Sequence, residues 1–291
     1  MKYNLNHSTV YEYRESVSSY HSIACLCPRT TPTQLCSNFS LSISPTPIEV
    51  VQRVDFFGNS VHYFSIQVPH KELRVAAKST IENIVSGQEL SYAEVYTCAN
   101  AREAFLNDYQ IKNEVMQYRL PSPFIQWDSE VEQFTRNCFA EEKSLFEAVR
   151  DLCSKIFHEF EFMPNYTTVH TPLKTILKEK KGVCQDFSHL AIAAIRSMGF
   201  AARYVSGYLE TLPPPGKEKL KGSDASHAWI SAYVPGIGWC DFDPTNNLIP
   251  RERHITTAWG RDYSDVPPLK GILFSSGQQK LTVEVDVLPV G

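Results

Sequence analysis

Apolar and polar residues alternate over much of the segment 3–85, which is the pattern of β-strands that bury one face. The odd positions of the stretch 35–43 carry its large apolar side chains, Leu35, Phe39, Leu41 and Ile43. Gly58 and Asn59 separate two apolar runs and form a dipeptide that is typical of a hairpin turn. Because an antiparallel sandwich covers one face of each such strand, we predict a β-rich N-terminal domain of this type over residues 1–95.

The spacing of apolar residues becomes helical after residue 95. Apolar residues recur at intervals of three and four behind Ser144, which predicts an amphipathic helix with Cys153 on its buried face as a core thiol. Ser129 with Glu132, and Ser144 with Glu147, fit capping boxes at helix starts. We therefore predict a helical lead-in over about residues 96–160.

A further helix and then several strands are predicted from residue 182 onward. The helix opens at Cys184, and strands follow at 201–209, 227–234 and 239–243, with a last strand at 280–287. The Pro- and Lys-rich loop 211–222 fits a surface excursion and a flap beside a cleft equally well. The prediction is an α+β protein whose second domain, 96–291, packs a helix on an antiparallel sheet and includes the C-terminal strand.

Composition excludes several classes of protein. The 291 residues are 43% apolar and 21% charged, which is ordinary for a globular chain, and the net charge is -4 without a long basic run. We therefore expect no nucleic-acid partner and no attachment to an anionic membrane. No apolar run approaches the ~20 residues of a membrane span, and no apolar signal core follows Met1. The eight cysteines include no Cys-x-x-Cys pair, so we predict reduced thiols and a cytoplasmic location.

Cys184 occupies a position that suits a reactive thiol. It follows Gly182 and Val183 and opens a buried helix, where unpaired backbone amides and the helix dipole favour a thiolate. A thiolate nucleophile also needs an imidazole, and that imidazole needs an orienting acceptor. A cysteine at a helix start is by itself more often a buried thiol than a nucleophile.

His227 and Asp243 meet these two needs. They lie 16 positions apart on two strands joined by a short turn, so an antiparallel pair can bring them side by side. One imidazole nitrogen would then bind the carboxylate and the other would face Cys184, as in a Cys-His-Asp triad. Each residue has an ordinary structural explanation as well, which for Asp243 is an Asx turn before Pro244.

A metal site is the chemical alternative, with Cys184, His189, His227 and Asp243 as conceivable zinc ligands. None of these residues shows the pair spacing of a zinc motif, so we predict no metal. No glycine-rich phosphate loop occurs, so no nucleotide or other cofactor is predicted.

Four groups of residues resemble one known family, namely Gly182-Val183-Cys184-Gln185-Asp186, Ala202-Arg203-Tyr204, Ser226-His227-Ala228-Trp229 and Asp243-Pro244-Thr245. They are similar to the motifs of the bacterial transglutaminase-like proteins, in the papain-like cysteine-peptidase and transglutaminase superfamily. Asp55-Phe56-Phe57-Gly58-Asn59 resembles the β-rich N-terminal domain of that family, and Gly260-Arg261-Asp262-Tyr263 its C-terminal segment. The resemblance implies a papain/transglutaminase-like core with Cys184 as nucleophile, His227 as base and then acid, and Asp243 as orienter.

The function expected from these residues is cysteine-dependent acyl transfer on a carboxamide or peptide bond of a peptide or protein substrate, through a thioester. Transfer to water makes a peptidase or amidase, and transfer to an amine makes a transglutaminase. The candidates for oxyanion or supporting roles are Tyr166, Gln185, Asp186 and Trp229. A non-catalytic peptide-binding or assembly module is the alternative, although all three triad residues are present. The sequence does not indicate an oligomeric state.

Overall fold

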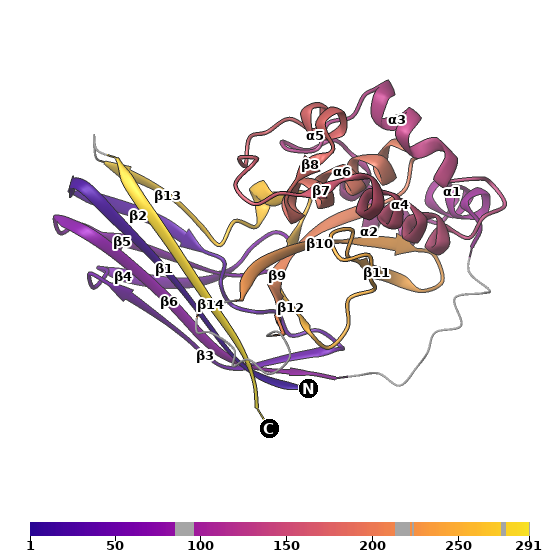
Figure 1. Ribbon diagram of the computed structural model, residues 1–291. Coiled ribbons are helices and arrows are strands. Elements are labelled where there is room, and N and C mark those ends of the chain that lie inside the picture. The colour runs from indigo at the N-terminus through magenta and orange to yellow at the C-terminus, as the bar shows by residue number, and fades with distance from the viewer. Residues whose placement is uncertain (85–95, 213–221, 223, 275–277, 291) are drawn as a thin grey trace.

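The computed structural model describes residues 1–84, 96–212, 222, 224–274 and 278–290. The protein has the predicted α+β fold: a β-sandwich at one end and an antiparallel sheet covered by helices at the other (Figure 1). The loop 211–222 was expected to be either a surface excursion or a flap beside a cleft. Most of it, residues 213–221, lies outside the described residues.

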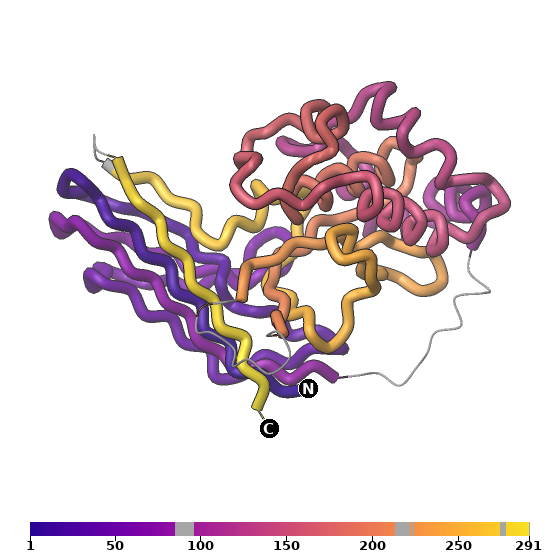
Figure 2. The backbone as a smooth tube through the Cα atoms, in the orientation of Figure 1, coloured from indigo at the N-terminus to yellow at the C-terminus, as the bar shows by residue number. Residues whose placement is uncertain are grey.

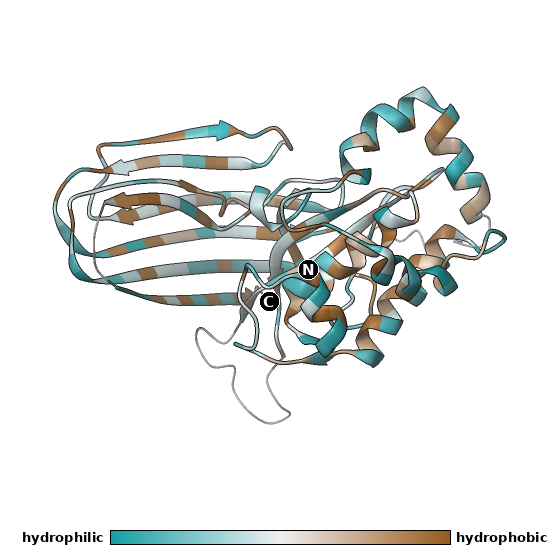
Figure 3. Cartoon of the chain, turned by 90° about the horizontal axis from the view of Figure 1, so that it is seen from above, coloured by the Kyte–Doolittle hydropathy of each residue, from teal (hydrophilic) through white to brown (hydrophobic). Residues whose placement is uncertain are grey.

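The sandwich consists of two four-stranded antiparallel sheets. The first has the order β14-β1-β6-β3, with the strands Lys2–Val17 (β1), Gln34–Ser44 (β3), His70–Asn83 (β6) and Gln279–Pro289 (β14). The second has the order β13-β2-β5-β4, with the strands Ser19–Ala24 (β2), Glu49–Val54 (β4), Ser60–Ile66 (β5) and Leu269–Phe274 (β13). Apolar and polar residues alternate along these strands (Figure 3), and the apolar face includes Val17, Phe64 and Leu73 in the core between the sheets.

Both ends of the chain contribute to this sandwich. The last strand, β14, pairs with β1 from Tyr3 opposite Pro289 to Tyr13 opposite Gln279, and β13 pairs with β2. The tube in Figure 2 accordingly runs indigo beside yellow. A domain boundary at residue 95 assigns the C-terminal strand to the second domain. That strand, β14, instead forms its hydrogen bonds with β1 in the sandwich. The division itself falls in residues 85–95, which are outside the described part of the chain.

The second region is built on the antiparallel sheet β11-β10-β9-β12. Its strands are Ala202–Leu209 (β9), Ala225–Val234 (β10), Gly238–Phe242 (β11) and His254–Gly260 (β12). Its α-helices are Cys98–Asn107 (α1), Tyr109–Val115 (α2), Ser129–Thr135 (α3), Leu145–Glu159 (α4), Leu173–Glu179 (α5) and Cys184–Ser197 (α6). Short 3-10 helices occupy Met116–Arg119 (η2), Arg136–Cys138 (η3) and Tyr263–Asp265 (η4). Helix α6 is buried along nearly its whole length because it packs on β9 and β10 and is covered by α3, α4 and α5.

The two predicted capping boxes do not form. Helix α3 is capped by Asp128, whose carboxylate accepts hydrogen bonds from the amides of Glu130 and Val131, so Ser129 lies inside the helix. The Ser144 hydroxyl makes no capping hydrogen bond to α4. Its backbone forms a bridge with Thr97 instead, a long-range contact that local sequence does not reveal.

The outer edge of β12 is covered by amide side chains from the sandwich. Gln34 donates to the Thr256 carbonyl oxygen at 2.8 Å and accepts from the Thr256 amide at 2.8 Å. Asn59, in the turn between β4 and β5, makes the same double contact with the backbone of Trp259, at 2.9 and 3.0 Å. These side chains take the place of a neighbouring strand and attach the sandwich to the sheet that carries the candidate site.

Candidate active site

Cys184 is the first residue of α6, and the start of this helix is fixed by Asp186. The Asp186 carboxylate accepts from the Val183 amide at 2.8 Å and from the Thr167 hydroxyl at 2.6 Å. Burial raises the pKa of Asp186, and the two hydrogen bonds partly counteract this. As the first helical residue, Cys184 has a backbone N–H for which the helix supplies no acceptor. The half-buried Cys184 thiol and this N–H, for which the helix supplies no acceptor, belong to the same residue.

Gly182 leaves room for this arrangement. The short parallel pair of Glu161–Phe162 (β7) with Lys181–Gly182 (β8) holds the chain just before Cys184. A Cβ atom at Gly182 would lie 2.8 Å from the Asp186 Oδ2 atom and 3.0 Å from the Asp186 Cβ atom. The absence of a side chain at Gly182 thus allows Asp186 to fold back over the helix start.

His227 lies between Cys184 and Asp243. Its Nε2 atom is 2.7 Å from the Asp243 Oδ2 atom, and its ring also forms a hydrogen bond with the Cys184 side chain. Burial alone would lower the pKa of His227, but the contacts with Asp243 and Cys184 outweigh it and raise that pKa to about 10. The imidazole is thus placed to hold a proton beside the sulfur.

Asp243 is fully buried and uses both carboxylate oxygens. Its Oδ1 atom accepts from the backbone amides of Thr245 and Asn246, so the Asx turn is present as well as the contact with His227. Its Oδ2 atom accepts from His227 and also from the Nε2 atom of His254, at 3.0 Å, and the Nδ2 atom of Asn246, at 2.8 Å. Burial would raise the pKa of Asp243, but hydrogen bonds from both histidines hold it well below its usual range. His227 therefore faces an ionised carboxylate.

His254 and Asn246 were not identified from the sequence. Asn246 belongs to the turn that begins at Asp243, so its proximity follows from a local signal, the Asp-Pro-Thr-Asn run. His254 begins β12, which is separated from β10 by β9 in the sheet. No spacing in the sequence encodes that contact.

The residues predicted to support the site have different surroundings in the structure. Trp229 is fully buried on β10, packs edge-on against His254 and donates its Nε1–H to Asp241 at 3.0 Å. Gln185 is half-buried on the first turn of α6. Tyr166 is 44% exposed, and its hydroxyl donates to Glu179 at 2.5 Å. To serve as an oxyanion donor, the Tyr166 hydroxyl would have to leave Glu179.

Cys153 and His189 have surroundings that fit a structural role. Cys153 lies in the buried core as predicted, and burial raises its pKa. His189 stacks on Phe124, and its Nε2 atom accepts a hydrogen bond from the Tyr263 amide. Burial lowers the pKa of His189 to about 4, so this ring is neutral. Its Nε2 lone pair is already occupied and is not free for a metal.

Among the residues that the structure describes, three ligand-type atoms come together at His227, Asp243 and His254, all within 4.8 Å of one another. Ligands around a tetrahedral zinc ion at ~2.1 Å are separated by about 3.4 Å. The two histidine nitrogens lie closer than that to the shared Asp243 oxygen, at 2.7 and 3.0 Å. These distances are those of hydrogen bonds, and the donors would have to separate to admit an ion.

A helix-borne cysteine facing a histidine and an aspartate on an adjoining antiparallel sheet defines the transglutaminase-like class of fold. Residues 132–244 match the model of the transglutaminase-like superfamily, and residues 3–82 match that of the bacterial transglutaminase-like N-terminal region. The chain belongs to the bacterial transglutaminase-like proteins of this superfamily.

Its similarity to known proteins extends over the whole chain. An uncharacterized protein of Mycobacterium tuberculosis is 35% identical over 99% of this chain and 93% of its own length. An uncharacterized protein of Mycobacterium leprae is 32% identical over 97% of this chain and 96% of its own length. A crystal structure from Cytophaga hutchinsonii, described as a "putative cysteine protease", superimposes with a TM-score of 0.74 at 21% identity, over 100% of this chain and 92% of the other. That likeness shows the shared fold.

Proposed function

We propose that the protein is a cysteine-dependent acyl-transfer enzyme that acts on a carboxamide or peptide bond of a peptide or protein. The observation that carries this proposal is the position of His227, which is hydrogen-bonded to the thiol of Cys184 on one side and to the buried carboxylate of Asp243 on the other. An imidazole held in this way can take the thiol proton and return it to a leaving group.

In the first half-reaction, the Cys184 sulfur attacks the substrate carbonyl carbon while His227 holds the thiol proton. The C–N bond then breaks, His227 donates that proton to the departing amine, and a thioester remains on Cys184. Asp243 stabilises the imidazolium throughout and fixes which nitrogen faces the sulfur. In the second half-reaction, water or an amine attacks the thioester, His227 takes its proton, and the thiol is restored.

The oxyanion that develops on the substrate needs donors that are in place beforehand. The Cys184 backbone N–H at the start of α6 is the first donor that we propose, because the helix leaves it without an acceptor. We propose Gln185 and Tyr166 as candidates for the second donor. Trp229 and Asp186 act as positioning residues in this proposal, through Asp241 and through the helix start respectively.

The acyl acceptor can be tested with a blocked glutamine dipeptide, with and without hydroxylamine. Released ammonia with hydroxamate formation identifies amine transfer, and ammonia without hydroxamate identifies hydrolysis. A matched series of blocked peptides reports peptide-bond cleavage by the appearance of new amino termini. Cys184→Ala is expected to abolish every product, whereas Cys153→Ala keeps turnover and loses about 1–2 kcal/mol of stability.

Equal turnover in wild type and Cys184→Ala would contradict the proposal. If folded wild-type protein instead gives no product and Cys184 is alkylated by iodoacetamide no faster than Cys153, the non-catalytic module takes its place. A variant of Cys153 is the matched control because that thiol lies in the core of the same region.

Of the helices in the described part of the chain, none is both long and apolar enough to cross a membrane. All eight cysteines lie among the described residues and are free thiols. This composition supports the reducing, cytoplasmic location that we propose.

A further inference from the structure

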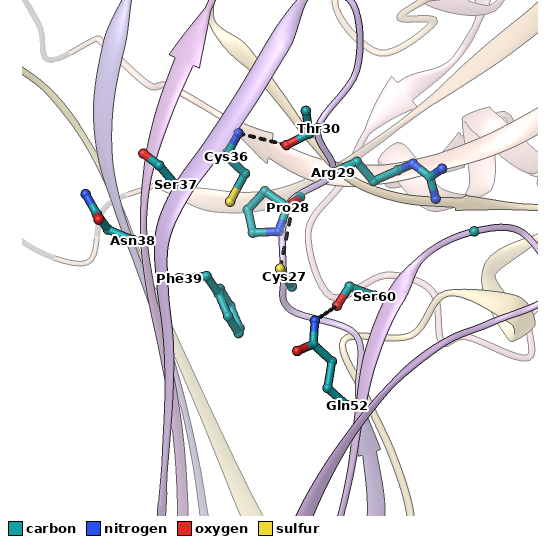
Figure 4. A pocket seen from close by; sticks show the side chains of 11 residues that line it. Cys27, Pro28, Arg29, Thr30, Cys36, Ser37, Asn38, Phe39, Gln52 and Ser60 are labelled. Carbon is teal, nitrogen blue, oxygen red and sulfur yellow. Dashed lines mark hydrogen bonds between the residues drawn. The ribbon is translucent and has the colours of Figure 1, made fainter.

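Two thiols in the sandwich face a common cavity, well apart in sequence from Cys184. Cys27 follows β2, and Cys36 lies near the start of β3. Both are half-buried and line an open cavity of about 330 Å³, together with Pro28, Phe39 and Ser60. Figure 4 shows the Cys36 sulfur directed toward the Cys27–Pro28 segment. The cavity thus gives a small molecule access to both sulfurs.

The two thiols are chemically unequal. The Cys27 sulfur donates to the Pro28 carbonyl oxygen at 3.8 Å, and both Cys36 and Ser60 also act on the Cys27 thiol. The contact with Cys36 lowers the pKa of Cys27 to about 7 against the effect of burial, while the same contact raises that of Cys36. Cys27 is therefore the more acidic of the two thiols, and Cys36 is the one that retains its proton to higher pH.

Two other thiols lack this combination. Burial raises the pKa of Cys25 to about 12, although it lies only two residues from Cys27. Burial also raises the pKa of Cys240 to about 12. An accessible thiolate next to a second thiol is the arrangement that peroxide-sensitive sites use.

We propose that Cys27 and Cys36 form a redox-active dithiol that is oxidised to a disulfide by a hydroperoxide. The Cys27 thiolate attacks one peroxide oxygen and breaks the O–O bond, which gives the Cys27 sulfenic acid and releases hydroxide or alkoxide. The Cys36 thiol then attacks the Cys27 sulfur, its proton leaves with the sulfenic hydroxyl as water, and an S–S bond forms. Two thiols are oxidised by two electrons and one peroxide is reduced by two electrons, and a thiol reductant reverses the change.

The segment between the two cysteines links the sandwich to β12. Arg29 stacks on Trp259 with its guanidinium carbon 3.5 Å from the ring centroid, and Gln34 holds Thr256 through its amide. A disulfide would enclose Arg29 and Gln34 in a covalent ring. Oxidation would thereby restrain the contact between the two regions of the molecule.

Trypsin separates the two thiols, which makes the disulfide simple to detect. Cleavage after Arg14, Arg29 and Arg53 places Cys27 in peptide 15–29 and Cys36 in peptide 30–53. The intact full-length protein is treated with one equivalent of hydrogen peroxide, blocked with N-ethylmaleimide and digested without reductant. We expect one cross-linked pair of these peptides, two hydrogens lighter than their sum, which dithiothreitol separates.

Peptide 15–29 also contains Cys25, so three variants assign the bond. Cys25→Ala should keep the cross-link, whereas Cys27→Ser and Cys36→Ser should each abolish it. Circular dichroism confirms that each variant is folded. In a second measurement, iodoacetamide should alkylate Cys27 with a midpoint near pH 7 in wild type and at a higher pH in Cys36→Ala.

Three results would overturn the proposal. The first is full alkylation of both peptides after peroxide. The second is a cross-link that survives in Cys27→Ser and is lost in Cys25→Ala. The third is over-oxidation of Cys27 to the sulfinic acid while Cys36 remains fully alkylated, because Cys36 would then not resolve the sulfenic acid.

Discussion

His254 donates from its Nε2 atom to the Asp243 Oδ2 atom at 3.0 Å, the same oxygen that His227 contacts. This one buried oxygen therefore accepts hydrogen bonds from the candidate catalytic imidazole and from a second imidazole on a different strand. His254 also lies against Trp229, so its ring is held on two sides. This makes His254 a positioning residue for the carboxylate that orients His227.

Replacing His254 by Ala should weaken the site without unfolding the protein. Because the His254 hydrogen bond helps to hold the pKa of Asp243 low, its loss should move the acid limb of the Cys184 alkylation profile to higher pH. The alkylation rate near neutrality should fall by about 10- to 100-fold. His254→Gln, which keeps a donor N–H, should recover part of both effects. An unchanged pH profile in His254→Ala would show that the histidine only fills space.

Asp243 should contribute stability in a defined pH range. Its pKa is lowered in the folded protein, so its contribution is present above the ordinary value of 3.8 and is lost as pH falls below it. At pH 7, Asp243→Asn should cost about 3–5 kcal/mol, because a buried charge partner is removed. Urea unfolding at several pH values from 3 to 7 measures this difference. The difference in unfolding free energy between wild type and variant should become smaller toward pH 3. A difference that does not change with pH would show that the ionisation of Asp243 does not stabilise the fold.

Gly182→Ala should displace the start of α6, which carries Cys184. The new Cβ would lie 2.8 Å from the Asp186 Oδ2 atom, so either Gly182 or the Asp186 carboxylate must shift. We expect a loss of about 1–3 kcal/mol in stability and slower alkylation of Cys184. Asp186→Gly removes the obstructing side chain, so Gly182→Ala should cost less in that background. Additive effects in this double-mutant cycle would exclude a clash with Asp186.

The amide contacts at the edge of β12 should also matter for the site. Gln34→Glu keeps the shape but places a carboxylate oxygen against the Thr256 carbonyl, where the amide nitrogen donates in wild type. The variant should lose about 1–3 kcal/mol in urea unfolding, and Cys184 should react more slowly because β12 carries His254. Gln52→Glu is the matched control, since that exposed side chain donates to the Ser60 hydroxyl within the sandwich and not to β12. Equal stability of the two variants would show that the edge contact is dispensable.

The local parts of the fold followed directly from the sequence. Alternation and the Gly58-Asn59 turn predicted the sandwich hairpin, where β4 and β5 pair and Gly58 has a φ of 78°. The helix start at Cys184 and the hairpin that joins His227 to Asp243 are short-range features, whereas the approach of Cys184 to that pair was expected from the needs of a thiolate nucleophile and from the family resemblance. Sequence spacing alone is informative when few residues separate the partners.

Contacts made across the sheets could not be predicted in this way. His254 reaches Asp243 only because β12 pairs with β9 and not with β10. The Ser144 backbone likewise pairs with a distant residue, Thr97, and the Ser144 hydroxyl does not cap α4. Pairing of β14 with β1 spans almost the whole chain, and alternation alone does not specify which strand is the neighbour.

The shared sandwich has a consequence for biosynthesis. On the ribosome, β1 and β2 are made early, but their partners β14 and β13 are among the last residues to emerge. Until then two strand edges have unsatisfied amides and carbonyls, which favour pairing with other chains. Nascent or prematurely terminated chains that lack residues 269–289 should therefore depend on chaperones and aggregate readily, whereas in the finished chain β14 and β13 cover the edges of β1 and β2.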